Sequence, residues 1–150
     1  MQSDAKTLVE KSEERTVTKP EAVVAHSDQA VVGLLERYLK KMGYKVSKFG
    51  VNGSALAKYA ELEPPPRLFF VDMTGTDLTG SIISGIKSAI KRFPLIPIRI
   101  IALTTNEKEQ AIANVAGANE VINPHALTSQ TISFSKFETM VEKLIKRRRE

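Results

Sequence analysis

Side chains that could do chemistry follow four short, mostly apolar runs of the sequence. The four groups are His26-Ser27-Asp28, Asp72-Met73-Thr74, Thr104-Thr105-Asn106 and Asn123-Pro124-His125. Carboxylates, imidazoles and hydroxyls can bind cations, accept protons or act in group transfer. Together the four groups offer two carboxylates, two imidazoles and several hydroxyls, but no lysine. Whether they can act together depends on the elements that position them.

A catalytic triad and a zinc site both fit these residues poorly. His26, Ser27 and Asp28 contain the residue types of a nucleophilic triad, but three consecutive residues cannot converge on one reacting atom. His26, His125 and Asp72 could in principle share a metal ion, whereas zinc sites normally have three or four ligands with further hydrogen-bond support. We therefore expect both histidines to be hydrogen-bonded or solvent-facing, and we assign no catalytic residue and no metal.

Other classes of site are excluded by what the sequence lacks. The glycine-containing loops at 50–53 and 74–80 match neither G-x-G-x-x-G nor a Gly-Lys-Ser/Thr ending, which excludes dinucleotide and P-loop sites. The absence of cysteine excludes disulfides, thiolate metal sites and thiol nucleophiles. No apolar run could span a bilayer, and residues 1–20 contain no apolar block of a secretory signal. The composition predicts a cytoplasmic protein.

The spacing of apolar residues predicts alternating strands and helices after residue 20. Strands are expected at 21–25, 44–49, 68–71, 98–103 and 120–122, and helices at 28–42, 52–62, 81–93, 107–116 and 134–148. This alternation favours an α/β fold of the flavodoxin-like (βα)5 class, a doubly wound, five-stranded parallel sheet with helices on both faces. The carboxyl ends of parallel strands meet at one edge, so the four polar groups should gather there.

Charge is distributed unevenly along the 150-residue chain, whose formal net charge is +5. Residues 1–20 are neutral overall and poor in apolar side chains, so we expect a flexible leader before a domain at 21–150. Residues 140–150 carry a net +3, which leaves +2 for residues 21–139. The basic C-terminal helix end can be a solvated terminus, a linker, or a contact for acidic partners, nucleic acid or anionic lipid. Nucleic acid is less favoured, because the basic excess does not cover a whole face.

Four stretches of the sequence occur in an order and spacing typical of one family. They are Leu68-Phe-Phe-Val-Asp72 with the loop to Gly80, Ile100-Ile-Ala-Leu-Thr104, Ala116-Gly117-Ala118, and Gln29 to Tyr44 as the first helix. Through them, residues 22–148 resemble the receiver domain of response regulators in two-component signalling. The resemblance implies that Asp72 corresponds to the phosphoacceptor aspartate and Thr104 to the switch hydroxyl. It also implies a Mg²⁺ site formed by that aspartate, by the carbonyl of Thr74 and by an acidic pair after the first strand.

The sequence departs from the receiver pattern at the positions that carry charge. His26 and Ser27 occupy the place of the acidic pair, and Asn123 or Pro124 occupies the place of the lysine that neutralises the phosphoryl group. Val121 stands where the family has its switch aromatic. Mg²⁺ is usually held through one or two carboxylates, and losing one electrostatic group typically costs about 10²–10³ in rate. We therefore expect no metal cofactor.

These departures predict an atypical receiver-like module, a pseudo-receiver, that binds a protein partner and is not an enzyme. The surroundings of Asp72 should then be set by Ser27, Thr74 and Thr104 rather than by a metal ion. Receivers use the face of their fourth helix, fifth strand and fifth helix for output domains and homodimers. That face would include Glu107, Gln110, Ala111, Asn114, Lys136, Glu138 and Thr139. The alternative is a response-regulator receiver phosphorylated at Asp72, with Mg²⁺ as cofactor.

Overall fold

The computed structural model describes residues 19–73, 80–129 and 131–146, so most of the expected leader lies outside them. The strands in these ranges are β2 (Glu21–Ala25), β3 (Lys45–Phe49), β4 (Leu68–Asp72), β5 (Arg99–Leu103) and β6 (Glu120–Ile122). The helices are α2 (Gln29–Lys41), α3 (Gly53–Tyr59), α4 (Ser81–Ala89), the 3-10 turn η2 (Ile90–Arg92), α5 (Glu107–Ala116), α6 (His125–Thr128) and α7 (Phe134–Lys146).

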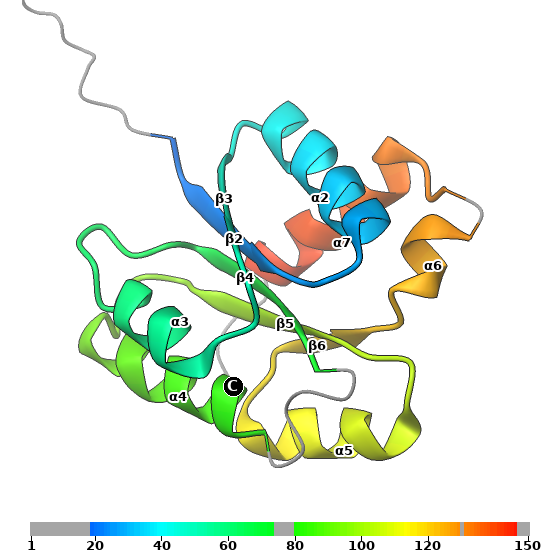
Figure 1. The fold of residues 1–150 in the computed structure, drawn as a ribbon. Coiled ribbons are helices and arrows are strands. Elements are labelled where there is room, and N and C mark those ends of the chain that lie inside the picture. Colours follow the sequence, from blue (N-terminus) through cyan, green and yellow to red (C-terminus); the bar gives the residue numbers. More distant parts are fainter. Residues whose placement is uncertain (1–18, 74–79, 130, 147–150) are drawn as a thin grey trace, which may run out of the picture.

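The strands form one sheet in the order β3-β2-β4-β5-β6, and every neighbouring pair is parallel (Figure 1). Helices α2 and α7, with the short α6, cover one face of the sheet, and α3, α4 and α5 cover the other. This order is that of a doubly wound, flavodoxin-like fold. The predicted fold class is confirmed, and the carboxyl ends of all strands share one edge.

The central strands β4 and β5 form the core because helices cover them on both faces. Every residue of both strands is buried, as their nearly continuous apolar runs predict. Leu68 and Phe70 pack in the cluster with α2 and α7, whereas Phe69 and Val71 pack in the cluster with α3 and α4. Full burial of one such side chain contributes about 1.5–3 kcal/mol. Asp72 therefore ends a strand that packing holds firmly.

The ends of α2 and α5 lie where the sequence predicts them. The Asp28 side chain caps α2 by accepting a hydrogen bond from the Ala30 amide at 2.9 Å. Gly43 follows α2 with φ +99°, and Gly117 ends α5 with φ +115°. Both glycines adopt the left-handed region that other residues occupy only under strain. The cap of α2 also fixes the backbone that follows His26.

Some boundaries differ from the prediction. The helix expected at 81–93 ends at Ala89 and tightens into η2, and the helix expected at 52–62 ends at Tyr59. The short helix α6 was not predicted, because four residues are too few to show helical periodicity. No helix in the described ranges is long and apolar enough to cross a membrane.

Candidate functional site

Asp72 is the last residue of β4 and lies at the shared carboxyl edge of the sheet. Its neighbour Val71 pairs with Ala25 of β2, and Asp72 itself pairs with Leu103 of β5. These pairings bring the residues after β2 and β5, namely His26 and Thr104, to the two sides of the Asp72 position. The Asp72 side chain is only 4% exposed. The predicted gathering of polar groups at this edge is therefore present, with a buried carboxylate at its centre.

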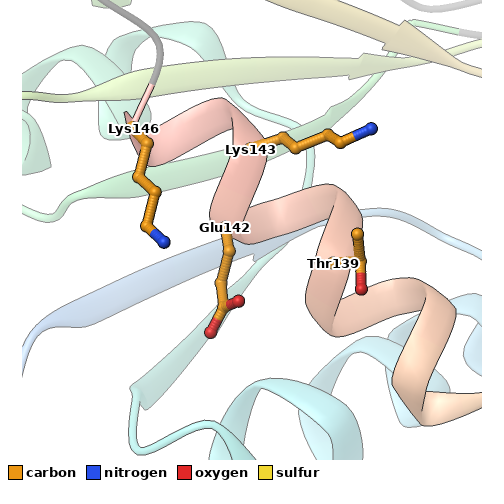
Figure 2. A pocket seen from close by; sticks show the side chains of 4 residues that line it. All are labelled: Thr139, Glu142, Lys143 and Lys146. Carbon is orange, nitrogen blue, oxygen red and sulfur yellow. The ribbon is translucent and has the colours of Figure 1, made fainter.

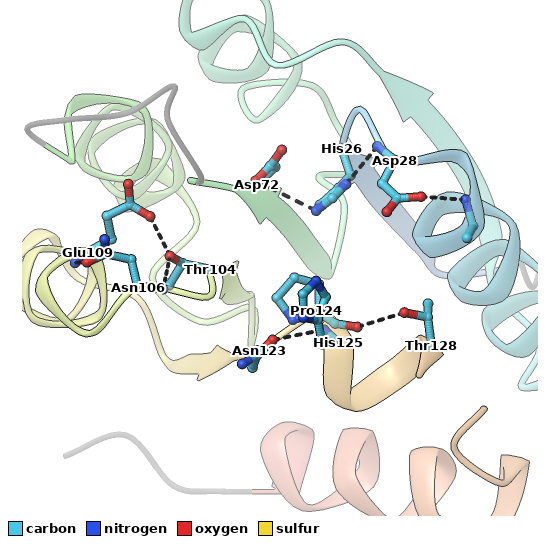
Figure 3. Close-up of polar contacts among 11 residues, drawn as sticks. His26, Asp28, Asp72, Thr104, Asn106, Glu109, Asn123, Pro124, His125 and Thr128 are labelled. Carbon is cyan, nitrogen blue, oxygen red and sulfur yellow. Dashed lines mark hydrogen bonds and ion pairs between the residues drawn. The ribbon is translucent and has the colours of Figure 1, made fainter. Parts of the chain in front are cut away.

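His26 is the side chain that lies against Asp72 (Figure 3). Its Nε2 atom is 3.6 Å from Asp72 Oδ1, and the imidazole is only 7% exposed. Its Nδ1 atom accepts a hydrogen bond from the Asp28 amide at 3.0 Å. Because Nδ1 is an acceptor, the proton of the neutral ring is on Nε2, facing the carboxylate. The separation is longer than a hydrogen bond, and Nε2 is a buried nitrogen without a hydrogen-bond partner in the described part of the chain.

Two expectations about this site need correction. His26 is neither solvent-facing nor fully hydrogen-bonded, because the turn into α2 directs its ring inward against β4. Ser27 is exposed, so its hydroxyl does not set the surroundings of Asp72, and His26 takes that place. Thr74 lies outside the described residues. One signal in the sequence could have indicated the inward ring of His26. Asp28 is recognisable as the cap of α2, and the cap fixes the Asp28 backbone amide that donates to His26 Nδ1.

The residues at this edge do not fit a Mg²⁺ site. The Asp28 carboxylate is engaged in capping α2, and the ring of His26 occupies space beside the Asp72 carboxylate. Mg²⁺ favours carboxylates and water in octahedral geometry. A softer metal fits no better, because a metal-binding histidine donates from its second nitrogen, whereas Nδ1 of His26 accepts. No cluster of three or more metal-ligating side chains occurs among the residues described.

Thr104 is buried after β5, and its hydroxyl turns toward α5 (Figure 3). It donates a short hydrogen bond to Glu109 Oε1 and accepts one from the Asn106 amide at 3.1 Å. The Asn106 side chain caps α5 by accepting from the Glu109 amide at 3.1 Å. These three bonds form a closed ring that ties the start of α5 to the end of β5. The hydroxyl that corresponds to the receiver switch is thus used within its own loop.

At the position that corresponds to the receiver lysine, Asn123 and Pro124 form a turn that leads into α6. Asn123 is exposed, and its side-chain oxygen accepts from the His125 amide at 2.9 Å. Pro124 is buried and precedes α6 at the N-cap position, while His125 is exposed, which agrees with the expectation of a hydrogen-bonded or solvent-facing histidine. Val121 is half-buried on the edge strand β6. The structure therefore places no cation at this position within the residues it describes.

Away from Asp72, a hollow of about 490 Å³ lies along α7 and is lined by Thr139, Glu142, Lys143 and Lys146 (Figure 2). All four side chains come from one helix, and Glu142 offsets part of the lysine charge. Residues 147–150, which include most of the basic run noted in the sequence, lie outside the described residues. Two lysines on one helix do not form the broad basic face of a nucleic-acid site.

Comparison with known proteins agrees with the fold. The chain matches no protein-family model and no curated protein. The receiver domain of a sensor histidine kinase from Pseudomonas aeruginosa, with Mg²⁺ in its active-site cleft, superposes with a TM-score of 0.65 at 18% identity, over 87% of this chain and all of that domain. A response regulator from Thermotoga maritima gives 0.62 at 17% identity, over 87% and 100% of the two chains. The CheY-like protein TadZ from Pseudomonas aeruginosa gives 0.63 at 17% identity, over 89% and 98%.

The fold is that of a receiver domain. Structural neighbours at this level of identity bear on the fold, so function has to be argued from the side chains at the carboxyl edge.

Proposed function

We propose that the chain is an atypical, cytoplasmic receiver-like signalling module that binds a protein partner without metal-dependent phosphorylation and without enzymatic activity. The observation that carries this proposal is the imidazole of His26 beside the Asp72 carboxylate. The Pseudomonas kinase receiver holds Mg²⁺ in its cleft. Here the ring of His26, whose Nδ1 accepts from the Asp28 amide, lies against the Asp72 carboxylate.

The charges around Asp72 support the proposal. Phosphoryl transfer depends on positioning and on neutralising the charge of the transferred group. With His26 and Asn123 at the relevant positions, the second carboxylate of the four polar groups is Asp28, which caps α2, and the described residues of these groups include no lysine for the phosphoryl group. Losing one such electrostatic group typically costs about 10²–10³ in rate. Two losses together leave phosphorylation too slow to signal.

The hydrogen bonds of Thr104 support it independently. A receiver switch needs its hydroxyl to move toward a phosphoryl group. In this chain the move would break the hydrogen bonds that the buried Thr104 hydroxyl makes with Glu109 and with the Asn106 amide. Each such loss costs about 1–3 kcal/mol. The start of α5 is therefore held in one position whatever the state of Asp72.

The partner surface we propose is the face formed by α5, β6 and α7. β6 is the last strand of the described sheet, and its outer side adjoins no further described strand, which is where partners often add to a sheet. Glu107, Ala111 and Asn114 on α5 are exposed, and Gln110 is half-buried. On α7, Lys136 and Thr139 are exposed and Glu138 is half-buried. This face therefore combines side chains of both charges with intermediate exposure, which suits a protein partner, either an output domain or a second copy of the chain.

The test has two arms. In the first, Mg²⁺ is titrated to millimolar concentration while amide chemical shifts are followed by NMR at His26, Met73 and Thr104, and no saturable shift is expected. In the second, the protein is treated with a small phosphodonor and analysed by mass spectrometry. A stoichiometric acyl phosphate on Asp72 would overturn the proposal and support the alternative, a phosphorylated response regulator. That alternative has one observation in its favour, the position of Asp72 at the end of β4.

A further inference from the structure

A groove lies at the amino end of the sheet, opposite the edge that holds Asp72. We call it the amino-end groove. It runs over the starts of β2 and β3 and the loop before β4, near Glu21, Lys45 and Arg67, and has a volume of about 1030 Å³. Its backbone is fixed, because the Lys45 amide donates to Pro20 O at 2.9 Å and the Arg67 amide donates to Glu21 O at 2.8 Å. The groove is therefore part of the folded sheet.

Four segments far apart in the sequence bring cations to this groove. Lys19 precedes β2, Lys40 is in the last turn of α2, Lys45 begins β3 and Arg67 precedes β4. Lys40 forms an ion pair with Glu36 at 2.9 Å. The other three cations have no carboxylate within ion-pair distance in the described ranges. Composition alone does not indicate this convergence, because the fold creates it.

The carboxylates of the groove offset only part of this charge. Glu21 Oε2 accepts hydrogen bonds from both the Tyr59 and Ser47 hydroxyls, which directs it toward α3 rather than toward Lys45. Glu63 is exposed at the rim. The lining therefore carries four cations against two carboxylates, Glu21 and Glu63, and Glu142 of α7 also acts on Tyr44, so the groove keeps a moderate positive excess. An anion that reaches the three cations outside ion pairs gains more than a single surface pair would supply.

The floor of the groove is apolar. Tyr44 is 8% exposed, Pro65 is buried and Val46 is half-buried, whereas Leu62 is 49% exposed at the rim. Burial raises the pKa of the Tyr44 phenol, with Arg67 acting in the opposite direction, so Tyr44 stays a neutral hydroxyl at physiological pH. A ligand that suits this surface has an apolar group for the floor and carboxylates for the three cations.

We infer that the amino-end groove docks an acidic segment of a protein partner, in which carboxylate side chains flank an apolar one. The inference rests on the protein-binding part of the proposed function and adds a second contact surface, at the amino end of the sheet. A peptide is the better occupant than a small molecule, because small-molecule sites usually enclose most of their ligand. Lys19, Lys45, Leu62 and Arg67 are all exposed, so this groove is open along its length.

The experiment uses the full chain, isotope-labelled for NMR, and a synthetic peptide of alternating glutamate and leucine. Saturable amide shifts are expected at Lys45, Val46 and Leu62. The affinity, measured in parallel by fluorescence anisotropy, should fall with added salt. The matched peptide with glutamine in place of glutamate should not bind. Lys45→Glu and Arg67→Glu should each weaken the acidic peptide by roughly fivefold to tenfold. Lys45→Gln removes one charge rather than reversing it, so the logarithm of the fold-change in peptide affinity should be about half that of Lys45→Glu.

The control variant is Lys108→Glu, which makes the same charge change on exposed α5. It should leave peptide affinity within about twofold, because exposed charges more than a Debye length apart are largely screened. Equal weakening by this control, shifts confined to α5, β6 or α7, or no saturable shift would each overturn the inference. None of these results concerns Asp72. Conversely, Mg²⁺ binding or an acyl phosphate would refute the proposed function and leave the groove unaffected.

Discussion

Restoring the acidic pair is the sharpest test of the account of Asp72. The double substitution His26→Asp with Ser27→Asp removes the imidazole and adds two carboxylates beside the existing one. In the native chain the His26 nitrogen is 3.6 Å from Asp72 Oδ1. Two unit charges about 4 Å apart interact by at most about 4 kcal/mol at a dielectric constant of about 20. Without metal, the variant should therefore be less stable than the native chain, by roughly 1–4 kcal/mol.

Mg²⁺ should reverse much of that loss in the variant and do nothing in the native chain. At a concentration ten times its dissociation constant, a ligand that binds only the folded state adds about 1.4 kcal/mol of stability. For a domain of this size, 1 kcal/mol corresponds to about 2–4 °C in Tm. The expected gain is therefore about 3–6 °C for the double variant and about zero for the native chain.

The assay is thermal unfolding followed by circular dichroism, with and without Mg²⁺. His26→Asn is the matched control, because it removes the imidazole without adding charge and should show no response to Mg²⁺. A native chain stabilised by Mg²⁺ to the same extent as the double variant would refute the reasoning, since His26 would then not prevent metal binding.

Three further predictions concern the neighbouring structure. Thr104→Val should destabilise the fold by about 1–3 kcal/mol in chemical denaturation by removing the hydroxyl that bonds to Glu109 and to the Asn106 amide, whereas Thr104→Ser should lose much less. Arg99→Met should lower stability by about 1–3 kcal/mol in the same assay, because the buried guanidinium donates to Leu144 O at 2.8 Å and holds the end of α7. Burial, with the Glu21 hydrogen bond, raises the pKa of Tyr59, so its contribution to stability is present below about pH 10 and is lost as pH rises through the folded-state pKa. Ultraviolet titration of tyrosinate should therefore show a late component that Tyr59→Phe removes, and a titration unchanged by that substitution would contradict the assignment.

Most of the fold could be predicted from the sequence because the sheet is central and covered on both faces. Buried parallel strands such as β4 and β5 require uninterrupted apolar runs, and these are visible without a structure. Helix ends were predictable where a side chain or a glycine determines them, as at Asp28 and Gly117. The stretch from Ile90 to Arg92 was not, since the change from α to 3-10 geometry depends on how the chain packs before β5.

The site was predictable only in part. That Asp72, His26 and Thr104 share one edge follows from parallel topology, but the direction of each side chain does not. The inward direction of the His26 ring depends on the backbone amide of Asp28, two residues further along the chain. The direction of the Thr104 hydroxyl depends on Glu109, which lies in the first turn of α5. The charge of the amino-end groove was hidden for a related reason, because its cations come from separate segments that only the folded sheet brings together.

Two features of the carboxyl edge, the ring of His26 beside Asp72 and the hydrogen bonds of Thr104, both remove a need for a bound metal ion or phosphoryl group. A cluster of carboxylates without a metal ion repels itself. Here a neutral imidazole, that of His26, lies beside Asp72 in place of a second carboxylate, so this repulsion does not arise. The Thr104 hydroxyl, which a phosphorylated receiver would turn toward the phosphoryl group, is hydrogen-bonded to Glu109 instead. The edge is therefore held together by its own side chains. Under the proposed function, such a module would present its partner surface whatever the state of Asp72, and the abundance or modification of the partner would regulate the interaction.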